Sequence, residues 1–270
     1  MMQQKCALQL YTLRDECKAD FPNVLRELKR MGWAGVQFAG YQGYEPEALA
    51  EVMLETGLHI KYQRVKEELD QVIAEAQLFK TRDLVISSTP EDLRNASGYM
   101  EVRKRLNEAR ERLRQEKMRI SYHNHAFEFD TTIEGRSTLE YLLEPTADNL
   151  LLAEIDVYWV KKGGKDLVSY LSPYSGRMPI IHLKDMTRDD VQTFAEIGER
   201  SIDFKPVLSW GERNGVEWYV VEQDRCRKDP MVCVQTSLPT CLASLQKLNN
   251  RGCHIGASTY MAGSRKSFML

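Results

Sequence analysis

The chain is poor in the features that define several common classes of protein. Its six cysteines include no Cys-x-x-Cys pair, which argues against a zinc knuckle or a dithiol motif. No apolar run approaches the roughly 20 residues of a membrane-spanning helix. The formal net charge is only -2, with both signs interleaved. We therefore expect neither a membrane nor a nucleic-acid partner.

Two further absences bear on the fold class and on the cellular compartment. The first predicted strand is not followed by Gly-x-Gly-x-x-Gly, the phosphate-binding turn of an open dinucleotide-binding sheet. Residues 1–5 lead straight into that strand, without the apolar segment of a secretory signal. We therefore expect a cytoplasmic protein in which the scattered cysteines are reduced.

Short apolar segments alternate with segments of helical periodicity along the chain. The predicted strands are 6–12, 35–40, 59–65, 83–88, the first part of 118–129, 150–157, 178–185 and 218–224. The predicted helices are 21–31, 46–56, 67–80, 98–117, 137–143, 165–172, 204–214 and 238–250. This alternation predicts an α/β fold, a single (β/α)8 TIM barrel over residues 1–252, with an open doubly wound sheet as the alternative. Residues 253–270 form a C-terminal tail without a clear pattern, and we assign it no role.

Ligand-type side chains follow four consecutive predicted strands. They are His123, His125 and Glu128 after the fifth strand, Asp156 after the sixth, His182, Lys184 and Asp185 after the seventh, and Glu222 and Asp224 after the eighth. The chain has only five histidines, so two within one tripeptide are a local concentration. Because the carboxyl ends of barrel strands meet at one rim, where such barrels carry their active sites, we expect these side chains to share a site.

Each of these residues also has a purely structural explanation. Asp156 can cap the segment that follows it, and His182 can be a buried neutral imidazole. Glu222 and Asp224 can be rim charges paired with Arg225 or Lys228. These explanations would all have to hold together on adjacent strands at one rim, and we therefore favour a functional site.

Two carboxylates and an imidazole form a mostly oxygen site for a divalent metal ion. Mn2+, Mg2+, Co2+, Fe2+ and Zn2+ all accept such ligands, so the metal stays open. An ion of this kind polarises a carbonyl and stabilises the enediolate that forms when a neighbouring C–H proton is removed. Lys184 adds positive charge for the same oxyanion, and Tyr158 and Trp159 offer flat apolar faces to a sugar ring.

Five motifs, taken together, resemble the sugar phosphate isomerase/epimerase family with the xylose isomerase-like TIM barrel. They are Tyr-His-Asn-His-Ala-Phe-Glu-Phe (122–129), Glu-Ile-Asp-Val-Tyr-Trp (154–159), His-Leu-Lys-Asp (182–185), Ile-Gly-Glu-Arg-Ser-Ile-Asp-Phe (197–204) and Val-Val-Glu-Gln-Asp (220–224). The resemblance covers roughly residues 5–252. It is fairly specific for the superfamily and much less so for one reaction.

The resemblance implies a divalent metal held by Asp156, His182 and Glu222. Family members usually add a glutamate from the fifth strand, and Tyr122 stands at the position that we align with it. Glu128 is our first choice for completing the ligand set, and His123, His125 or water are the alternatives.

The resemblance also implies catalytic and substrate-binding residues. Glu222 and Glu128 are the candidates for moving the proton, with His125 as a further base and Lys184 as a catalytic cation. His123, Trp159 and Arg188 are candidates for binding a small-molecule sugar or polyol substrate. A homo-oligomer is compatible with the sequence.

Four activities remain open at this point. The first is an isomerase or epimerase of a small sugar or keto-sugar, or its phosphate. The second is a lyase or dehydratase on an inosose or a 3-keto-glycoside. An endonuclease at abasic DNA sites is disfavoured by the few histidines and the net charge of -2. The fourth is a carbohydrate-binding barrel that has lost its metal.

Overall fold

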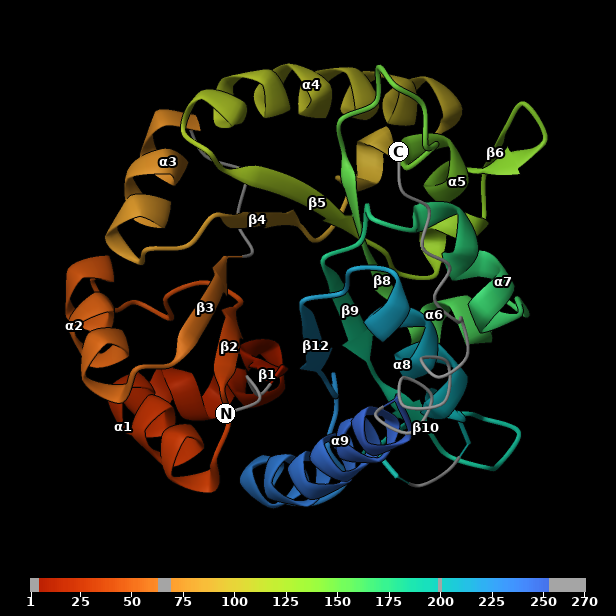
Figure 1. The fold of residues 1–270 in the computed structure, drawn as a ribbon. Coiled ribbons are helices and arrows are strands. Elements are labelled where there is room, and N and C mark those ends of the chain that lie inside the picture. The colour runs from red at the N-terminus through yellow and green to blue at the C-terminus, as the bar shows by residue number, and fades with distance from the viewer. Residues whose placement is uncertain (1–4, 63–68, 199–200, 253–270) are drawn as a thin grey trace, which may run out of the picture.

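The computed structural model describes residues 5–62, 69–198 and 201–252, which form a closed parallel barrel surrounded by helices (Figure 1). The barrel strands follow the order β1-β12-β9-β8-β5-β4-β3-β2, and β1 pairs with both β12 and β2 to close the ring. They are β1 (Cys6–Gln9), β2 (Gly35–Phe38), β3 (His59–Tyr62), β4 (Asp83–Ile86), β5 (Arg119–His123), β8 (Leu152–Asp156), β9 (Ile180–Leu183) and β12 (Trp218–Val221). The predicted TIM barrel is therefore confirmed, and the open sheet is excluded.

The helices lie outside the ring of strands. They are α1 (Arg14–Met31), α2 (Pro46–Thr56), α3 (Leu69–Leu78), α4 (Ala96–Gln115), α5 (Thr138–Leu142), α6 (Val157–Lys162), α7 (Leu167–Leu171), α8 (Phe204–Arg213) and α9 (Pro230–Gly252). Short 3-10 turns cover Leu10–Leu13, Glu91–Leu93, Phe127–Phe129 and Ser172–Tyr174. No helix in these described parts of the chain is long and apolar enough to cross a membrane.

Two helices begin earlier than their apolar periodicity predicts. In α1 the backbone leaves helical geometry at Asp20, where φ is -157°, and the Asp20 carboxylate accepts a 3.0 Å hydrogen bond from the Asn23 N–H. The predicted cap at Asp20 is therefore present, but it lies at a kink inside a longer helix. Helix α9 begins at Pro230 rather than Leu238. The end of the third predicted strand, residues 63–65, and the tail 253–270 lie outside the described residues.

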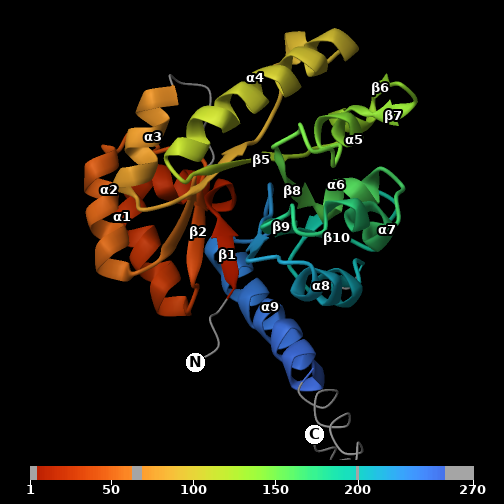
Figure 2. The ribbon, with the colours of Figure 1, turned by 45° about the horizontal axis from the view of Figure 1, so that its top comes forward.

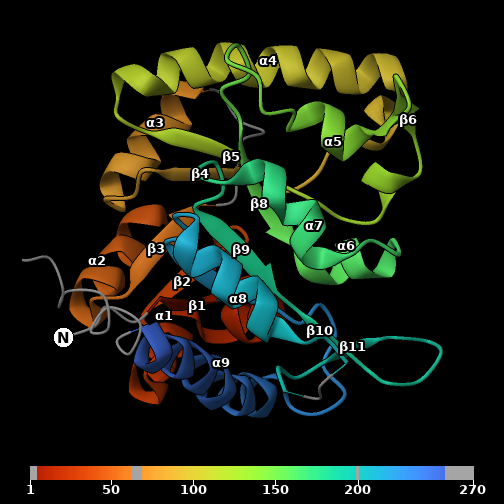
Figure 3. The same cartoon turned by 45° about the vertical axis from the view of Figure 1, so that its right-hand side comes forward.

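The sequence prediction missed three short elements near the carboxyl rim. Two are hairpins, β6 (Thr132–Ile133) with β7 (Arg136–Ser137) and β10 (Asp185–Met186) with β11 (Phe194–Ala195). The loop between β10 and β11 extends away from the barrel (Figure 3). The third is α6, which starts directly after β8. Segments this short have too few residues to show a periodic pattern.

The barrel interior changes from apolar to polar along the strands. Ala7, Ile180, Trp218 and Val220 form a small apolar cluster of their own. Successive residues of a strand point to opposite faces. Residues two positions further along β9 and β12, His182 and Glu222, therefore share the face of Ile180 and Val220. The apolar cluster thus closes the barrel below a polar layer.

The prediction that all the cysteines are reduced is wrong for one pair. Cys6 on β1 and Cys241 on α9 form a disulfide, which joins residues 235 positions apart in the sequence. Helix α9 runs past β1 (Figure 2), and this packing brings the two cysteines together. The spacing of cysteines in the sequence does not predict a disulfide between residues that only tertiary packing brings together.

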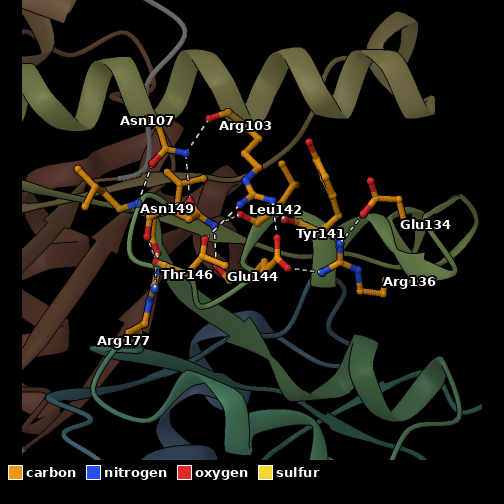
Figure 4. Close-up of polar contacts among 12 residues, drawn as sticks. Arg103, Asn107, Glu134, Arg136, Tyr141, Leu142, Glu144, Thr146, Asn149 and Arg177 are labelled. Carbon is orange, nitrogen blue, oxygen red and sulfur yellow. Dashed lines mark hydrogen bonds and ion pairs between the residues drawn. The ribbon is translucent and has the colours of Figure 1, made fainter.

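A polar network fixes the connection from α5 to β8 against α4 (Figure 4). Asn149 is buried at its centre. Its side-chain amide donates to the carbonyls of Leu142 and Glu144, each at 2.9 Å, and accepts from Asn107 at 3.0 Å. Arg177 donates to carbonyls of the same connection at residues Thr146, Asn149 and Leu151. These bonds hold the loop that leads into β8, the strand that carries Asp156.

We predict that Asn149→Ala lowers the free energy of unfolding by about 3 kcal/mol, because it leaves buried carbonyls without a donor. Urea denaturation of the purified variant measures the change. Glu134→Ala at the exposed end of the network is the control, and we expect it to change stability by less than about 0.5 kcal/mol. Equal stability of the two variants would contradict a central role for Asn149.

Candidate active site

Four side chains from neighbouring strands converge at the carboxyl ends of the barrel. His123 ends β5, Asp156 ends β8, His182 lies on β9, and Glu222 follows β12. One ligand atom from each lies within 4.8 Å of those of the other three, and all four residues are buried. Three of the four were predicted as metal ligands. His123, predicted mainly as a substrate-binding residue, takes the fourth place.

Glu154 lies among the histidines of this group and is fully buried. Its Oε1 is 2.9 Å from His182 Nε2 and 3.3 Å from His123 Nδ1. Gln37 on β2 donates to both Glu154 oxygens, at 3.0 and 3.2 Å, and its own Oε1 lies 2.6 Å from His182 Nε2. Carboxylates that accept from the far nitrogen of a histidine fix the ring for metal binding. His182 Nδ1 faces Glu222, and His123 Nδ1 is buried without a hydrogen-bond partner.

Neighbouring groups of opposite charge determine the protonation states of His182 and Glu154. Burial opposes the charge on His182, but Glu154 and Glu222 raise its pKa to about 10. Burial likewise opposes the charge on Glu154, and the facing histidines lower its pKa to about 2. Without a metal, His182 therefore carries a proton between two carboxylates, and its Nδ1 lies 3.0 Å from Glu222 Oε2.

Lys184 brings a second positive charge to the site and is almost completely buried. Its Nζ lies 2.8 Å from Asp156 Oδ2, 3.1 Å from Glu222 Oε2 and 2.7 Å from Asp224 Oδ1. Burial opposes this charge, but Asp156 and the two carboxylates after β12 keep the Lys184 pKa well above its ordinary value. Burial and the neighbouring Glu222 raise the pKa of Asp224 to about 6.

The donor set fits a divalent cation. Glu154, Asp156, Glu222 and Asp224 bring more negative charge than Lys184 and a protonated His182 compensate, and uncompensated buried carboxylates are costly. His123, Asp156, His182 and Glu222 would hold the ion, because they offer two imidazole nitrogens and two carboxylates. Lys184 would remain beside it as a fixed positive charge.

A cavity of about 730 Å³ opens beside these residues. His123, His125, Trp159 and Glu222 line it, together with Tyr11, Arg14, Ala39, Gly40, Ser87, Ser88, Phe194, Asp224 and Arg225. Trp159 Nε1 and His125 Nδ1 are buried and have no hydrogen-bond partner in the structure. Unsatisfied donors and acceptors of this kind are suited to a polar ligand. The size of the cavity suits a small molecule.

Of the remaining predicted site residues, some line the cavity and others lie outside it. His125 lies 6.1 Å from Trp159, ring to ring, and stacks on Phe127 at 5.4 Å. Burial and the neighbouring His123 lower the pKa of His125 to about 3, so its imidazole is neutral. Arg188 is exposed in the loop between β10 and β11 and does not line the cavity.

Glu128 lies outside the four-residue group, although it was a predicted ligand and base. One of its oxygens accepts from the Tyr122 hydroxyl at 2.8 Å and the other from the His125 N–H at 2.7 Å. The Tyr122 hydroxyl also lies 2.8 Å from Thr89 Oγ1. Tyr122 and Glu128 are fully buried, and neither lines the cavity. In this structure Glu128 fixes the backbone that carries His125.

The sequence prediction gave no role to Glu154, to Gln37 or to the ion pair of Asp224 with Lys184. The alternation of side chains along a strand could have identified Glu154. Glu154 lies two residues before Asp156, so both side chains point to the same face of β8. A carboxylate at an interior strand position inside a barrel requires a buried partner.

Comparisons with known proteins agree with this fold. No protein-family model matches the chain. An inosose dehydratase from Clostridium tetani is 27% identical over 152 residues, which are 49% of this chain and 50% of that protein. Another, from Geobacillus kaustophilus, is 31% identical over 134 residues, 43% of this chain and 41% of that protein. The chain thus spans about half the length of the curated relatives that it matches.

Solved structures match over most of the chain. A sugar phosphate isomerase/epimerase from Parabacteroides distasonis superposes with a TM-score of 0.74 at 22% identity, covering 90% of this chain and 98% of that one. An AP endonuclease of family 2 from Brucella melitensis superposes with a TM-score of 0.67 at 14% identity, covering 87% and 98%. The chain has the fold of the sugar phosphate isomerase/epimerase and xylose isomerase-like TIM barrel proteins. Identities this low establish the fold alone.

Proposed function

We propose that the protein is a divalent-metal-dependent enzyme that removes the proton beside a carbonyl of a small keto-sugar or keto-polyol. The observation that carries this proposal is the buried group of His123, Asp156, His182 and Glu222, of which His123 and Glu222 line a ligand-sized cavity. A cation bound there would polarise the substrate carbonyl and lower the pKa of the neighbouring C–H. Isomerisation or epimerisation follows when the proton returns to the substrate.

The residues around the cavity supply the other requirements of this chemistry. Lys184 places a buried positive charge 5.5 Å from the centre of the Trp159 ring, where it can stabilise negative charge on a substrate oxygen. Glu222 is an ionised carboxylate in the cavity wall, since burial is outweighed by Lys184 and His182 and its pKa stays well below the ordinary value. It is therefore our candidate for accepting the carbon-bound proton.

His125 and Trp159 would orient the substrate. The neutral His125 imidazole has an unpartnered Nδ1, and the Trp159 indole has an unpartnered N–H. Both can bond to sugar hydroxyls, and the Trp159 face can cover a ring carbon. Glu128, held by Tyr122 and the His125 N–H, would act only through the position of His125.

A dehydratase is the second candidate, because the curated relatives that match are named inosose dehydratases. Dehydration shares its first step with isomerisation, since both remove a proton beside a carbonyl. The outcomes differ in whether the adjacent hydroxyl then leaves as water. The buried site can serve either reaction.

Proton exchange in D2O tests both candidates together. We expect metal-supplemented protein to replace the hydrogen beside the carbonyl of D-fructose or scyllo-inosose with deuterium, as followed by NMR, and EDTA to stop this exchange. Recovery of a deuterated isomer identifies an isomerase or epimerase, and loss of water identifies a dehydratase. Binding of both sugars without any exchange would contradict the proposal and favour a non-catalytic carbohydrate-binding barrel.

A further inference from the structure

The cavity is lined by side chains of both charges. Glu222 and Asp224 line it beside the buried ligand group. Arg14 and Arg225 line the same cavity and are at least partly exposed. No carboxylate in the described parts of the chain forms an ion pair with either arginine. A divalent cation accounts for the acidic residues, but it leaves the two arginines unexplained.

The two arginines follow neighbouring strands and line the same cavity. Arg14 follows β1 through the 3-10 turn Leu10–Leu13, and Arg225 follows β12, which pairs with β1. Arg14 Nη1 donates to the carbonyl of Tyr11 at 2.9 Å and to that of Asp224 at 3.0 Å. Its guanidinium carbon lies 4.6 Å from the centre of the Tyr11 ring. Arg14 is thus tied to the residue directly before Arg225.

These contacts occupy only part of the Arg14 guanidinium. The group has five N–H donors, and the two recorded hydrogen bonds share one nitrogen. Two guanidinium groups that line one cavity give it positive charge, which an anionic group of a ligand would neutralise. Their planar donors match the paired oxygens of a carboxylate or phosphate. Ser87 and Ser88, also in the cavity wall, offer hydroxyls to the same ligand.

We propose that Arg14 and Arg225 form a subsite for an anionic group of the substrate. The substrate class is then a keto-sugar that carries a phosphate or carboxylate away from its carbonyl, rather than a neutral polyol. This inference rests on the proposed function for the position of the carbonyl, which lies beside Glu222. The anionic group would contact the two guanidinium groups that line the same cavity.

Calorimetric titration of matched sugars tests the subsite. The probes are D-fructose, D-fructose 6-phosphate and D-fructuronate, whose charged groups lie at C6, away from the C2 carbonyl; they are added to the full chain supplied with Mn2+. We expect at least one anionic sugar to bind about tenfold or more tightly than D-fructose, and the stronger of the two identifies phosphate or carboxylate as the preferred group. The preference should weaken with added salt, since the subsite is solvent-accessible.

Two variants separate this subsite from general electrostatic attraction. The double variant Arg14→Gln/Arg225→Gln should lose the preference for the anionic sugar and leave the weak binding of D-fructose unchanged. Arg227→Gln is the matched control, because Arg227 is exposed two residues further along and does not line the cavity. It should retain the preference.

Absence of a preference in the unmodified protein, or its persistence in the double variant, would overturn the subsite. Circular dichroism of each variant checks that the fold is kept. The readout is binding, so a protein that fails to catalyse proton exchange can still show the subsite. Failure of the proposed reaction and failure of this inference are therefore distinguishable.

Discussion

Replacing His182 with alanine is expected to abolish both metal binding and proton exchange while the barrel stays folded. His182 lies at the centre of the site, with Glu154 at 2.9 Å on one side of its ring and Glu222 at 3.0 Å on the other. Its removal deletes one ligand and leaves two buried carboxylates facing a gap. We expect exchange beside the carbonyl to fall by at least about a thousandfold, which corresponds to about 4 kcal/mol of activation free energy.

The measurement pairs elemental analysis of the purified variant with the D2O exchange assay. His59→Ala is the matched control, because His59 on β3 contacts Trp218 at the opposite end of the barrel. It should keep both metal and activity. Normal metal content in His182→Ala would show that His182 is not a ligand.

Replacing Glu154 with glutamine is expected to weaken metal binding by about 10- to 100-fold without deleting a ligand. The variant keeps the size of the side chain but loses the negative charge that lies 2.9 Å from His182 and 3.3 Å from His123. In the metal-free protein, loss of this carboxylate also lowers the pKa of His182 from about 10. NMR titration of the histidines measures that shift, and competition with a fluorescent chelator measures the metal affinity.

The pH dependence of stability gives Glu154 a separate signature. Its pKa is about 2 in the folded protein and lies near 4.5 for an unperturbed glutamate. Its stabilising contribution is therefore fully present above pH 4.5 and is lost as the pH falls towards 2. The stability difference between metal-free wild type and Glu154→Gln should shrink over that range. An unchanged metal affinity and unchanged histidine titration would show that Glu154 has no positioning role.

The barrel could be predicted from the sequence because the pattern that indicates it is periodic and recurs in every strand–helix unit. Each strand–helix unit carries its own alternation of apolar segments, so errors at helix ends, such as Asp20 and Pro230, do not change the topology. Asp156, His182 and Glu222 were also recognisable as a group, because parallel strands place their carboxyl ends at one rim. The structure brings these three residues together as expected.

The parts that sequence missed depend on side-chain direction and tertiary packing. Tyr122 and His123 are neighbours on β5, and strand alternation sends them to opposite sides of the barrel wall. Tyr122 bonds with Thr89 and Glu128, and His123 faces the ligand group. Because Tyr122 aligns with the usual glutamate, Glu128 was our first choice for the fourth ligand. A shift of one residue along a strand moves the side chain to the other face, so His123, directly after Tyr122, points to the ligand group.

Other misses arose from loops and long-range contacts. Arg188 was a candidate substrate-binding residue, but it lies exposed in the β10–β11 loop. Gln37 comes from β2, far from Glu154 in sequence, and only closure of the barrel places them 3.0 Å apart. The Cys6–Cys241 disulfide likewise depends on α9 packing against β1.

Metal content of the purified protein, measured by elemental analysis beside Asp156→Ala, tests the central claim most directly. Asp156 has one oxygen bonded to the Tyr158 N–H and the other directed at Lys184, so its loss removes a ligand and a buried charge partner. We predict about one equivalent of a divalent metal in the wild type after re-addition, and its loss in the variant. Equal metal content in the two proteins, or none in the wild type after re-addition, would contradict the metal site at this rim.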